Sequence, residues 1–373
     1  MNQVATTVSP RDLFLDCLKG FAIATVVLGH TFQDATPDFD HYLPFRIVYA
    51  FHMPMFMFVS GMTASFSVSR RLNTELNFLS YVHEIRSKAL RLLVPFVTWA
   101  VIQYYMIHPA GYGPATWLLH VFQAPDNGLW FLLTLFQCSC VMALVSMVVQ
   151  IASSRLAARQ PGGTSNSTIL YLTLIVVGLL AYPLMRLIPL SATFLPKLFF
   201  IYFFAGVVFH ILRPAGLPNA TRWIPYVIFV ALVPFWYRTE TSPAALLFRH
   251  PALADFVYHY LVAFAGTLAF VDLVRLFADN TATFLTRAVA YVGKRSLDIY
   301  AIHFYFLAYF PPVIAPIAIS LGVSFLLRTN FVTSWLCLGQ KPLDIWRIVR
   351  DRLPMNTPRR SGMMDKAVIT SRE

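Results

Sequence analysis

The sequence predicts an all-α protein, a polytopic helix bundle that is integral to a membrane. Of its 373 residues, 57% are hydrophobic and 12% are charged, whereas about a quarter of the residues of a soluble domain carry charge. Apolar runs approaching the roughly 20 residues that span a bilayer recur along the chain, with no long polar block between them. We therefore expect one membrane domain, residues 1–340, followed by a short basic tail, residues 341–373.

About ten apolar segments are long enough, or nearly long enough, to cross a bilayer as helices. In chain order they are 13–32, 45–66, 89–107, 129–151, 168–188, 198–212, 224–238, 252–275, 296–310 and 312–327. The last two are short, because Pro311, Pro312 and Pro316 leave little room for two complete crossings.

The basic residues orient these spans. With the N-terminus in the cytoplasm, 23 of the 29 lysines and arginines lie on the cytoplasmic side and five on the other side, as the positive-inside rule requires. Both termini are then cytoplasmic, and the stretch KPLDIWRIVRDRL after residue 340 is expected to lie along the membrane surface as an amphipathic helix. The net charge of +12 thus reflects topology, and dispersed cations do not indicate a nucleic-acid partner.

The first span carries three ionisable side chains, Asp16, Lys19 and His30. Each costs about 2.5–3.5 kcal/mol on insertion scales, which makes such groups functional hypotheses. Lys19 and His30 project from one side of the helix, about 16 Å apart along its axis, and Asp16 can neutralise Lys19. The pattern predicts a polar stripe that faces one protein-lined cavity. The alternative is that Lys19 snorkels and that His30 is an interfacial histidine.

The second and third spans carry further polar groups. His52 lies near the start of the second span, and the small pair Ser60-Gly61 lies deeper, where it allows neighbouring backbones to approach. Three cations at the start of the third span have two interpretations: they satisfy the positive-inside rule, or they clamp the phosphates of a nucleotide cofactor. These cations are Arg86, Lys88 and Arg91.

Polar and aromatic side chains also mark the fourth and ninth spans. Trp130 begins the fourth span at the membrane interface. Ser296, Tyr300 and His303 share one face of the ninth span, while Asp298 points elsewhere and is expected to pair with Lys294 or Arg295. The four cysteines have no metal-ligand spacing, so we expect them to be structural and expect no metal.

Five stretches in order resemble the acyltransferase 3 family of polytopic membrane O-acyltransferases, in its sugar 4-O-acetylase-like branch. They are LDCLKGFAIATVVLGH, FHMPMFMFVSGM, KALRLLVPF, LWFLLTLF and GKRSLDIYAIH. The resemblance covers approximately residues 11–340. Lys19 stands where the family usually has arginine, which replaces a bidentate grip by a point charge.

The resemblance implies transfer of an acyl group, most often acetyl, from cytosolic acyl-CoA to a carbohydrate hydroxyl at the bacterial inner membrane. An imidazole can take the hydroxyl proton near neutral pH, so His30 is the candidate base, or alternatively a transient acyl carrier. Lys19 would hold the donor or stabilise the oxyanion, with Asp16 orienting it. Arg86, Lys88 and Arg91 would grip the CoA phosphates. The residues expected at the acceptor end are His52, Trp130, Ser296, Tyr300 and His303.

Two other functions fit parts of this pattern. A secondary transporter would use buried Asp, Lys and His side chains as a relay. A membrane acyltransferase that acts on lipids would share most of the same features.

Overall fold

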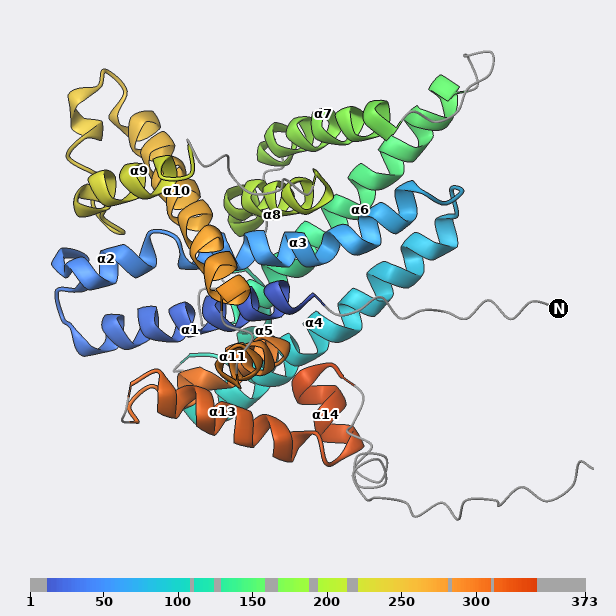
Figure 1. Cartoon of the computed structure of the whole chain (residues 1–373). Helices are drawn as coiled ribbons and strands as arrows, with labels where there is room; N and C mark the ends of the chain where they lie inside the picture. Colours follow the sequence, from blue (N-terminus) through green and yellow to red (C-terminus); the bar gives the residue numbers. More distant parts are fainter. Residues whose placement is uncertain are drawn as a thin grey trace, which may run out of the picture.

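The computed structural model of the chain describes residues 12–107, 111–123, 129–157, 167–187, 194–212, 221–280, 284–309 and 312–340. Within these ranges it consists of helices and connecting turns without strands, which confirms the predicted all-α class (Figure 1). The predicted tail, residues 341–373 with its amphipathic helix, lies outside the described residues.

Six helical segments of the described chain are long and apolar enough to cross a membrane. They are α1 (Leu13–Ala35), α2 with α3 (Leu43–Tyr49 and His52–Leu72), α4 (Phe78–Ile107), α6 (Trp130–Ala157), α7 (Ser167–Arg186) and α10 (Pro251–Asn280). The protein is therefore a multi-pass membrane protein.

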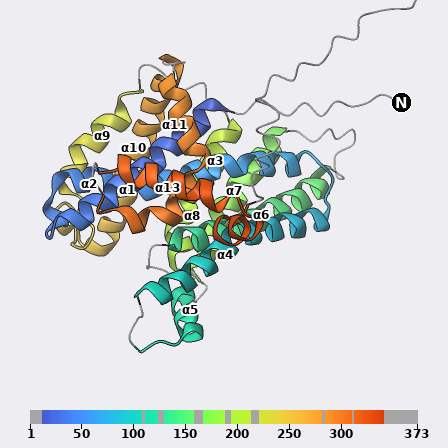
Figure 2. The same ribbon diagram turned by 90° about the horizontal axis from the view of Figure 1, so that it is seen from below.

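Three of the remaining predicted spans correspond to shorter apolar helices, α8 (Phe194–Leu212), α9 (Ile224–Leu232) and α13 (Ile314–Leu327). The other α-helices are α5 (Pro114–Gln123), α11 (Phe284–Lys294), α12 (Ser296–Ile302) and α14 (Phe331–Leu338). The described ranges also contain the short 3-10 helices η1 (Phe39–His41), η3 (Val233–Phe235), η4 (Ala245–Leu247) and η5 (His303–Phe306). The turned view shows α5 standing apart from the bundle beside the end of α4 (Figure 2).

The predicted ninth span, 296–310, is wrong as a single helix. Helix begins earlier, at Phe284, breaks at Arg295, and changes to a 3-10 helix at His303. The segment before the break was not predicted, because Arg287 and Lys294 give it a polar face that is unlike a membrane span.

The predicted second span, 45–66, is interrupted at Ala50 and Phe51, between α2 and α3. Pro54 explains the break, because a proline ring clashes with the carbonyl group four residues earlier, here that of Ala50.

The start of α1 is also explained by a local interaction. The Asp12 carboxylate caps the helix by accepting a hydrogen bond from the Leu15 N–H group at 3.2 Å.

Glycines bring the central helices together. A Cβ atom at Gly61 of α3 would overlap the carbonyl oxygen of Phe203 in α8, and one at Gly206 would overlap that of Phe58. The close approach that Ser60-Gly61 predicted is thus confirmed. Helix α11 packs on α1 in the same manner, since a Cβ at Gly293 would overlap the Asp16 carbonyl oxygen.

A buried ion pair ties α12 to α13. Asp298, 2% exposed, accepts a hydrogen bond from Arg328 Nη2 at 2.5 Å and one from Ser324 Oγ at 2.6 Å. The predicted partner Arg295 is also within reach, at 3.9 Å, but Arg328 is much closer, and no local pattern indicates Arg328 as a partner.

Candidate active site

Two cavities lie toward opposite ends of α1. We call the first the basic cavity; its volume is about 470 Å³ and its lining includes Asp16 and Lys19. We call the second the histidine cavity; its volume is about 800 Å³ and its lining includes His30 and His52. The polar stripe that the sequence predicted on α1 therefore exists, but it opens into two cavities rather than one.

Positive charge dominates the basic cavity. Five cations and two carboxylates line it: Lys19, Arg70, Lys88, Arg91, Lys294, Asp12 and Asp16. Asp16 lies between two of the cations, with its oxygens 4.0 Å from Lys19 Nζ and 3.8 Å from Lys294 Nζ. The predicted pairing of Asp16 with Lys19 is present, and Lys294 joins it.

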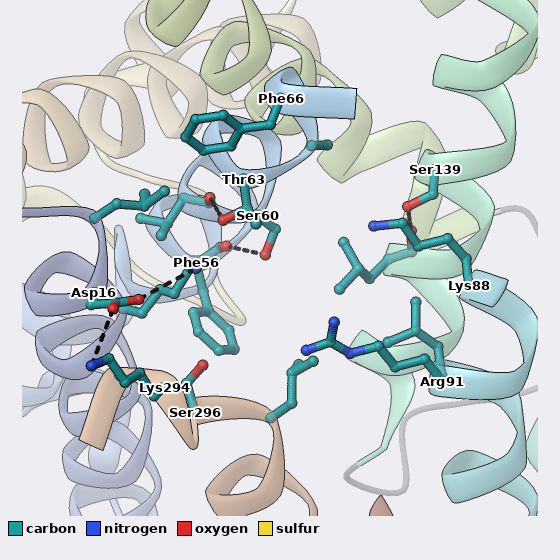
Figure 3. A pocket seen from close by; sticks show the side chains of 18 of the residues that line it. Asp16, Phe56, Ser60, Thr63, Phe66, Lys88, Arg91, Ser139, Lys294 and Ser296 are labelled. Atoms are coloured by element: carbon teal, nitrogen blue, oxygen red, sulfur yellow. Dashed lines mark hydrogen bonds and ion pairs between the residues drawn. The ribbon is translucent and has the colours of Figure 1, made fainter. Parts of the chain in front are cut away.

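The other three cations of this cavity, Arg70, Lys88 and Arg91, form no ion pair with another described residue. Figure 3 shows Lys88 and Arg91 on the side of the cavity opposite Asp16 and Lys294, with Ser60 and Thr63 between the two sides. Unpaired cations around a concave surface are suited to a polyanionic ligand such as a phosphate group.

The structure places only two of the three cations of the predicted phosphate clamp at the basic cavity. Lys88 and Arg91 line the basic cavity, whereas Arg86 is exposed and is not among the lining residues. Two residues along a helix correspond to about 160° around it, so Arg86 and Lys88 point in nearly opposite directions. Arg70, which the sequence analysis did not single out, is the third cation of this cavity that forms no ion pair with a described residue.

The histidine cavity has mainly aromatic walls. The aromatic and histidine residues in its lining are His30, Tyr49, His52, Trp130, Phe199, Tyr202, Trp236, Phe256, His259, Tyr260 and Tyr300. Three charged side chains, Arg238, Glu240 and Asp255, also line it. Of the residues predicted for the acceptor end, His52, Trp130 and Tyr300 line this cavity, while Ser296 lines the basic cavity instead.

Three predicted histidines from separate helical segments meet beside this cavity. The ring centroid of His30 in α1 is 5.5 Å from that of His303 in η5 and 6.4 Å from that of His52 in α3. His303 is fully buried and does not line the cavity itself. His30 is half-buried and lines the cavity, so of these three imidazoles it is the most accessible to a ligand.

The two buried imidazoles each have one nitrogen engaged. Nδ1 of His52 is 3.2 Å from the Val48 carbonyl oxygen, and Nδ1 of His303 is 2.9 Å from that of Tyr300. A carbonyl oxygen only accepts, so each Nδ1 carries the proton and each Nε2 is an acceptor. Neither Nε2 atom has a hydrogen-bond partner within the described part of the chain. Such buried unpaired groups cost about 1–3 kcal/mol each, which is tolerated most readily at functional sites.

Three aromatic rings connect the walls of the two cavities. Phe56 lines the basic cavity and stacks on Phe131 with ring centroids 4.6 Å apart. Phe131 is 5.2 Å from Tyr300, which lines the histidine cavity. The Tyr300 hydroxyl accepts a hydrogen bond from the Phe131 N–H group at 3.3 Å. These rings, which we call the aromatic partition, link the lining of the basic cavity to that of the histidine cavity.

Arg238 is a cavity residue that the sequence analysis missed. Its guanidinium group lies 5.0 Å from the centre of the Tyr49 ring. The backbone N–H group of Arg238 donates a hydrogen bond to the buried carboxylate of Asp40 at 2.6 Å. Burial alone would raise the pKa of Asp40, but hydrogen bonds from the Thr239 hydroxyl and from the Arg238 and Thr239 N–H groups outweigh burial and lower it. Asp40 therefore holds the loop that presents Arg238.

Comparisons with known proteins indicate an acyltransferase domain. A family model described as an acyltransferase domain matches residues 12–339. The chain is similar to the Nodulation protein NolL of Sinorhizobium fredii (strain NBRC 101917 / NGR234), with 34% identity over 96 residues, which are 25% of this chain and 24% of the relative. It is also similar to the NolL protein of Mesorhizobium japonicum (strain LMG 29417 / CECT 9101 / MAFF 303099), with 32% identity over 96 residues and the same coverage. The chain thus spans about a quarter of each relative. No solved structure matches it.

Proposed function

The chain belongs to the acyltransferase 3 family, and from this membership we propose that it is a membrane O-acyltransferase that moves an acyl group from cytosolic acyl-CoA to a hydroxyl of a carbohydrate. Acetyl is the acyl group that the sequence resemblance favours. The observation that carries the proposal is the pair of cavities on α1, one with unpaired cations and one with histidines.

The basic cavity is the proposed donor site. CoA is a polyanion, and phosphate oxygens form strong charge-assisted hydrogen bonds with arginine and lysine. Arg70, Lys88 and Arg91 supply cations that form no ion pair with a described carboxylate. Lys19 lies in this cavity, about 16 Å along the helix from His30. We therefore assign Lys19 to donor binding rather than to an oxyanion at His30, with Asp16 orienting it.

The histidine cavity is the proposed acceptor site. Its aromatic side chains offer flat apolar surfaces to a sugar ring, and Arg238 and Asp255 offer polar contacts. In the reaction His30 takes the hydroxyl proton while the sugar oxygen attacks the thioester carbonyl carbon. The tetrahedral intermediate then expels the CoA thiolate, which receives the proton from the His30 imidazolium. The ester, free CoA thiol and neutral His30 result, so the step needs no further reactant.

The aromatic partition lies on the route between donor and acceptor. On this proposal, the packed rings of Phe56, Phe131 and Tyr300 move apart to let the thioester reach His30. In the closed arrangement they would keep the thioester away from water that enters the histidine cavity. Exclusion of water from a reactive intermediate is a common function of such gates.

The orientation of the protein follows from the distribution of its basic residues. With the basic cavity toward the cytoplasm, the donor arrives from the compartment that contains acyl-CoA. The sequence resemblance supports the bacterial inner membrane as its location. Family membership favours this enzyme over a secondary transporter, while a lipid-linked sugar remains within the acceptor class proposed.

A vesicle experiment tests this function. Inside-out membrane vesicles that contain the protein and enclose surface polysaccharide from cells lacking the gene are given external acetyl-CoA labelled in the acetyl group. We expect label on the polysaccharide, and none with vesicles from cells that lack the protein. Consumption of no acetyl-CoA, together with movement of a solute across the vesicle membrane, would contradict the proposal and favour a transporter.

A further inference from the structure

Two residues beside His30, Gln33 and Tyr49, form an ordered contact that the reaction described above does not use. The Tyr49 hydroxyl donates a hydrogen bond to Gln33 Oε1 at 2.6 Å. The Gln33 side chain is within hydrogen-bonding reach of the His30 side chain, and the Tyr49 ring also approaches His30 edge to face, with ring centroids 6.2 Å apart. Gln33 is three residues after His30, so both project from one side of α1, while Tyr49 is the last residue of α2.

The position of Tyr49 is fixed by its surroundings. Its ring stacks on Phe45 with centroids 4.2 Å apart and packs against His52 at 4.4 Å. On another side it faces Gly29, where an added Cβ would be only 3.2 Å from two ring carbons. The Tyr49 hydroxyl is therefore delivered to Gln33 by a ring with little freedom to move.

We propose that Gln33 and Tyr49 are positioning residues that hold His30 in the form needed for a base, an inference that rests on the proposed function. An amide oxygen has two lone pairs. Tyr49 occupies one of them, and the His30 N–H group donates to the other. The second ring nitrogen of His30 then keeps its lone pair for the acceptor hydroxyl. A base whose orientation is fixed by a third group is the arrangement that activates hydroxyls in other acyl-transfer sites.

The neighbouring histidines cannot fulfil this role. His52 and His303 each engage Nδ1 with a backbone carbonyl oxygen, and their Nε2 atoms contact no hydrogen-bond partner among the described residues. Their rings pack around His30 without fixing which of its nitrogens bears the proton. Among the described residues, Gln33 is the side chain that lies within hydrogen-bonding reach of His30.

The test is a kinetic comparison of single variants of the full-length protein in detergent. The substrates are labelled acetyl-CoA and the surface polysaccharide from cells lacking the gene. Tyr49→Phe removes only the hydroxyl and should lower kcat about tenfold. Gln33→Leu removes the acceptor oxygen and should lower kcat about 100-fold, within the range for loss of acid–base catalysis. In both variants the KM for acetyl-CoA should stay unchanged, because the donor site is the distant basic cavity.

A conservative variant separates positioning from packing. Gln33→Glu keeps an oxygen that can accept both hydrogen bonds, so it should regain most of the kcat that Gln33→Leu loses. Tyr42→Phe is the matched control, because Tyr42 lies at the other end of α2 and is 39% exposed; its kcat should equal that of the wild type.

Each outcome has a distinct meaning. If the wild type transfers acetyl groups and Tyr49→Phe and Gln33→Leu keep its kcat, the inference is overturned while the proposed function stands. Equal loss of kcat in Gln33→Leu and Gln33→Glu, or loss of acetyl-CoA binding in Tyr49→Phe, would also overturn it by assigning these residues to folding. If the wild type transfers nothing, the proposed function itself fails.

Discussion

Replacement of Lys88 or Arg91 by alanine should weaken binding of acetyl-CoA, whereas replacement of Arg86 should not. Lys88 and Arg91 line the basic cavity and form no ion pair with another described residue, so their charge is available to a ligand. Arg86 lies on the same helix only two and five residues away, but its exposed side chain is outside the cavity lining. The three substitutions remove the same unit of charge, so total charge cannot explain a difference between them.

The magnitude follows from the number of contacts. A hydrogen bond to a charged group contributes about 1.5–3 kcal/mol, and each 1.4 kcal/mol corresponds to a tenfold change in affinity. Loss of one phosphate contact should therefore raise the dissociation constant of acetyl-CoA roughly 10- to 100-fold. The effect of Lys88→Ala and Arg91→Ala should shrink at high ionic strength, because salt screens exposed charges.

The assay is direct binding of acetyl-CoA to the purified protein by calorimetry, at low and at high salt. Desulfo-CoA, which keeps the phosphates but lacks the reacting sulfur, is the control ligand and should respond to the three substitutions in the same way. An affinity loss in Arg86→Ala equal to that in Lys88→Ala would refute the reasoning, since it would show that general charge rather than the cavity governs binding.

Three further predictions concern stability, each measured by thermal unfolding in detergent. Asp40→Asn should lower the free energy of unfolding by about 1–3 kcal/mol at pH 7. The pKa of Asp40 is lowered in the folded protein, so its stabilising contribution is complete above the unfolded pKa of about 4 and is lost as the pH falls below that value. The stabilities of wild type and variant should therefore converge in acid. Asp298→Ala leaves Arg328 as a buried unpaired charge and should lower the free energy of unfolding by about 3–5 kcal/mol. A decrease below about 1 kcal/mol would show that the ion pair is dispensable. Gly61→Ala should force α3 away from the Phe203 carbonyl and cost more than 1 kcal/mol, and an unchanged midpoint would disprove the close contact.

Much of the site could be predicted from single helices. Asp16, Lys19 and His30 were visible because ionisable groups in an apolar run have few structural explanations. The helical period also contained a signal that was not used: Lys88 and Arg91 are about 60° apart around α4, whereas Arg86 is about 160° from Lys88. That calculation separates Arg86 from the clamp without any structure.

Contacts between helices could not be predicted in this way. Spacing shows which side chains share a face of one helix, but it gives no distance between helices, so only the family resemblance placed His52 and His303 near His30, where the structure has them. The aromatic partition is another such feature, because its phenylalanines look like ordinary lipid-facing or core residues in the sequence. Ser296 and His303 were predicted to share a helical face, yet Ser296 lines the basic cavity, whereas His303 lies in η5 and is buried beside the histidine cavity.

Arg238 and Gln33 illustrate a second limit. Arg238 follows a loop, and its position depends on Asp40, which is distant in the sequence. Gln33 lies near the end of α1, where a polar residue is unremarkable. Neither position has a local pattern that indicates a site.

The most direct test of the account is a single-turnover measurement on His30→Ala. The variant is loaded with labelled acetyl-CoA, its affinity for the donor is recorded, and transfer to the acceptor polysaccharide is then followed. Because His30 lines the histidine cavity and the proposed donor site is the basic cavity, the affinity should stay that of the wild type while the transfer rate falls about 10²- to 10⁴-fold. Transfer at the wild-type rate would contradict the account, and so would loss of transfer caused entirely by loss of acetyl-CoA binding.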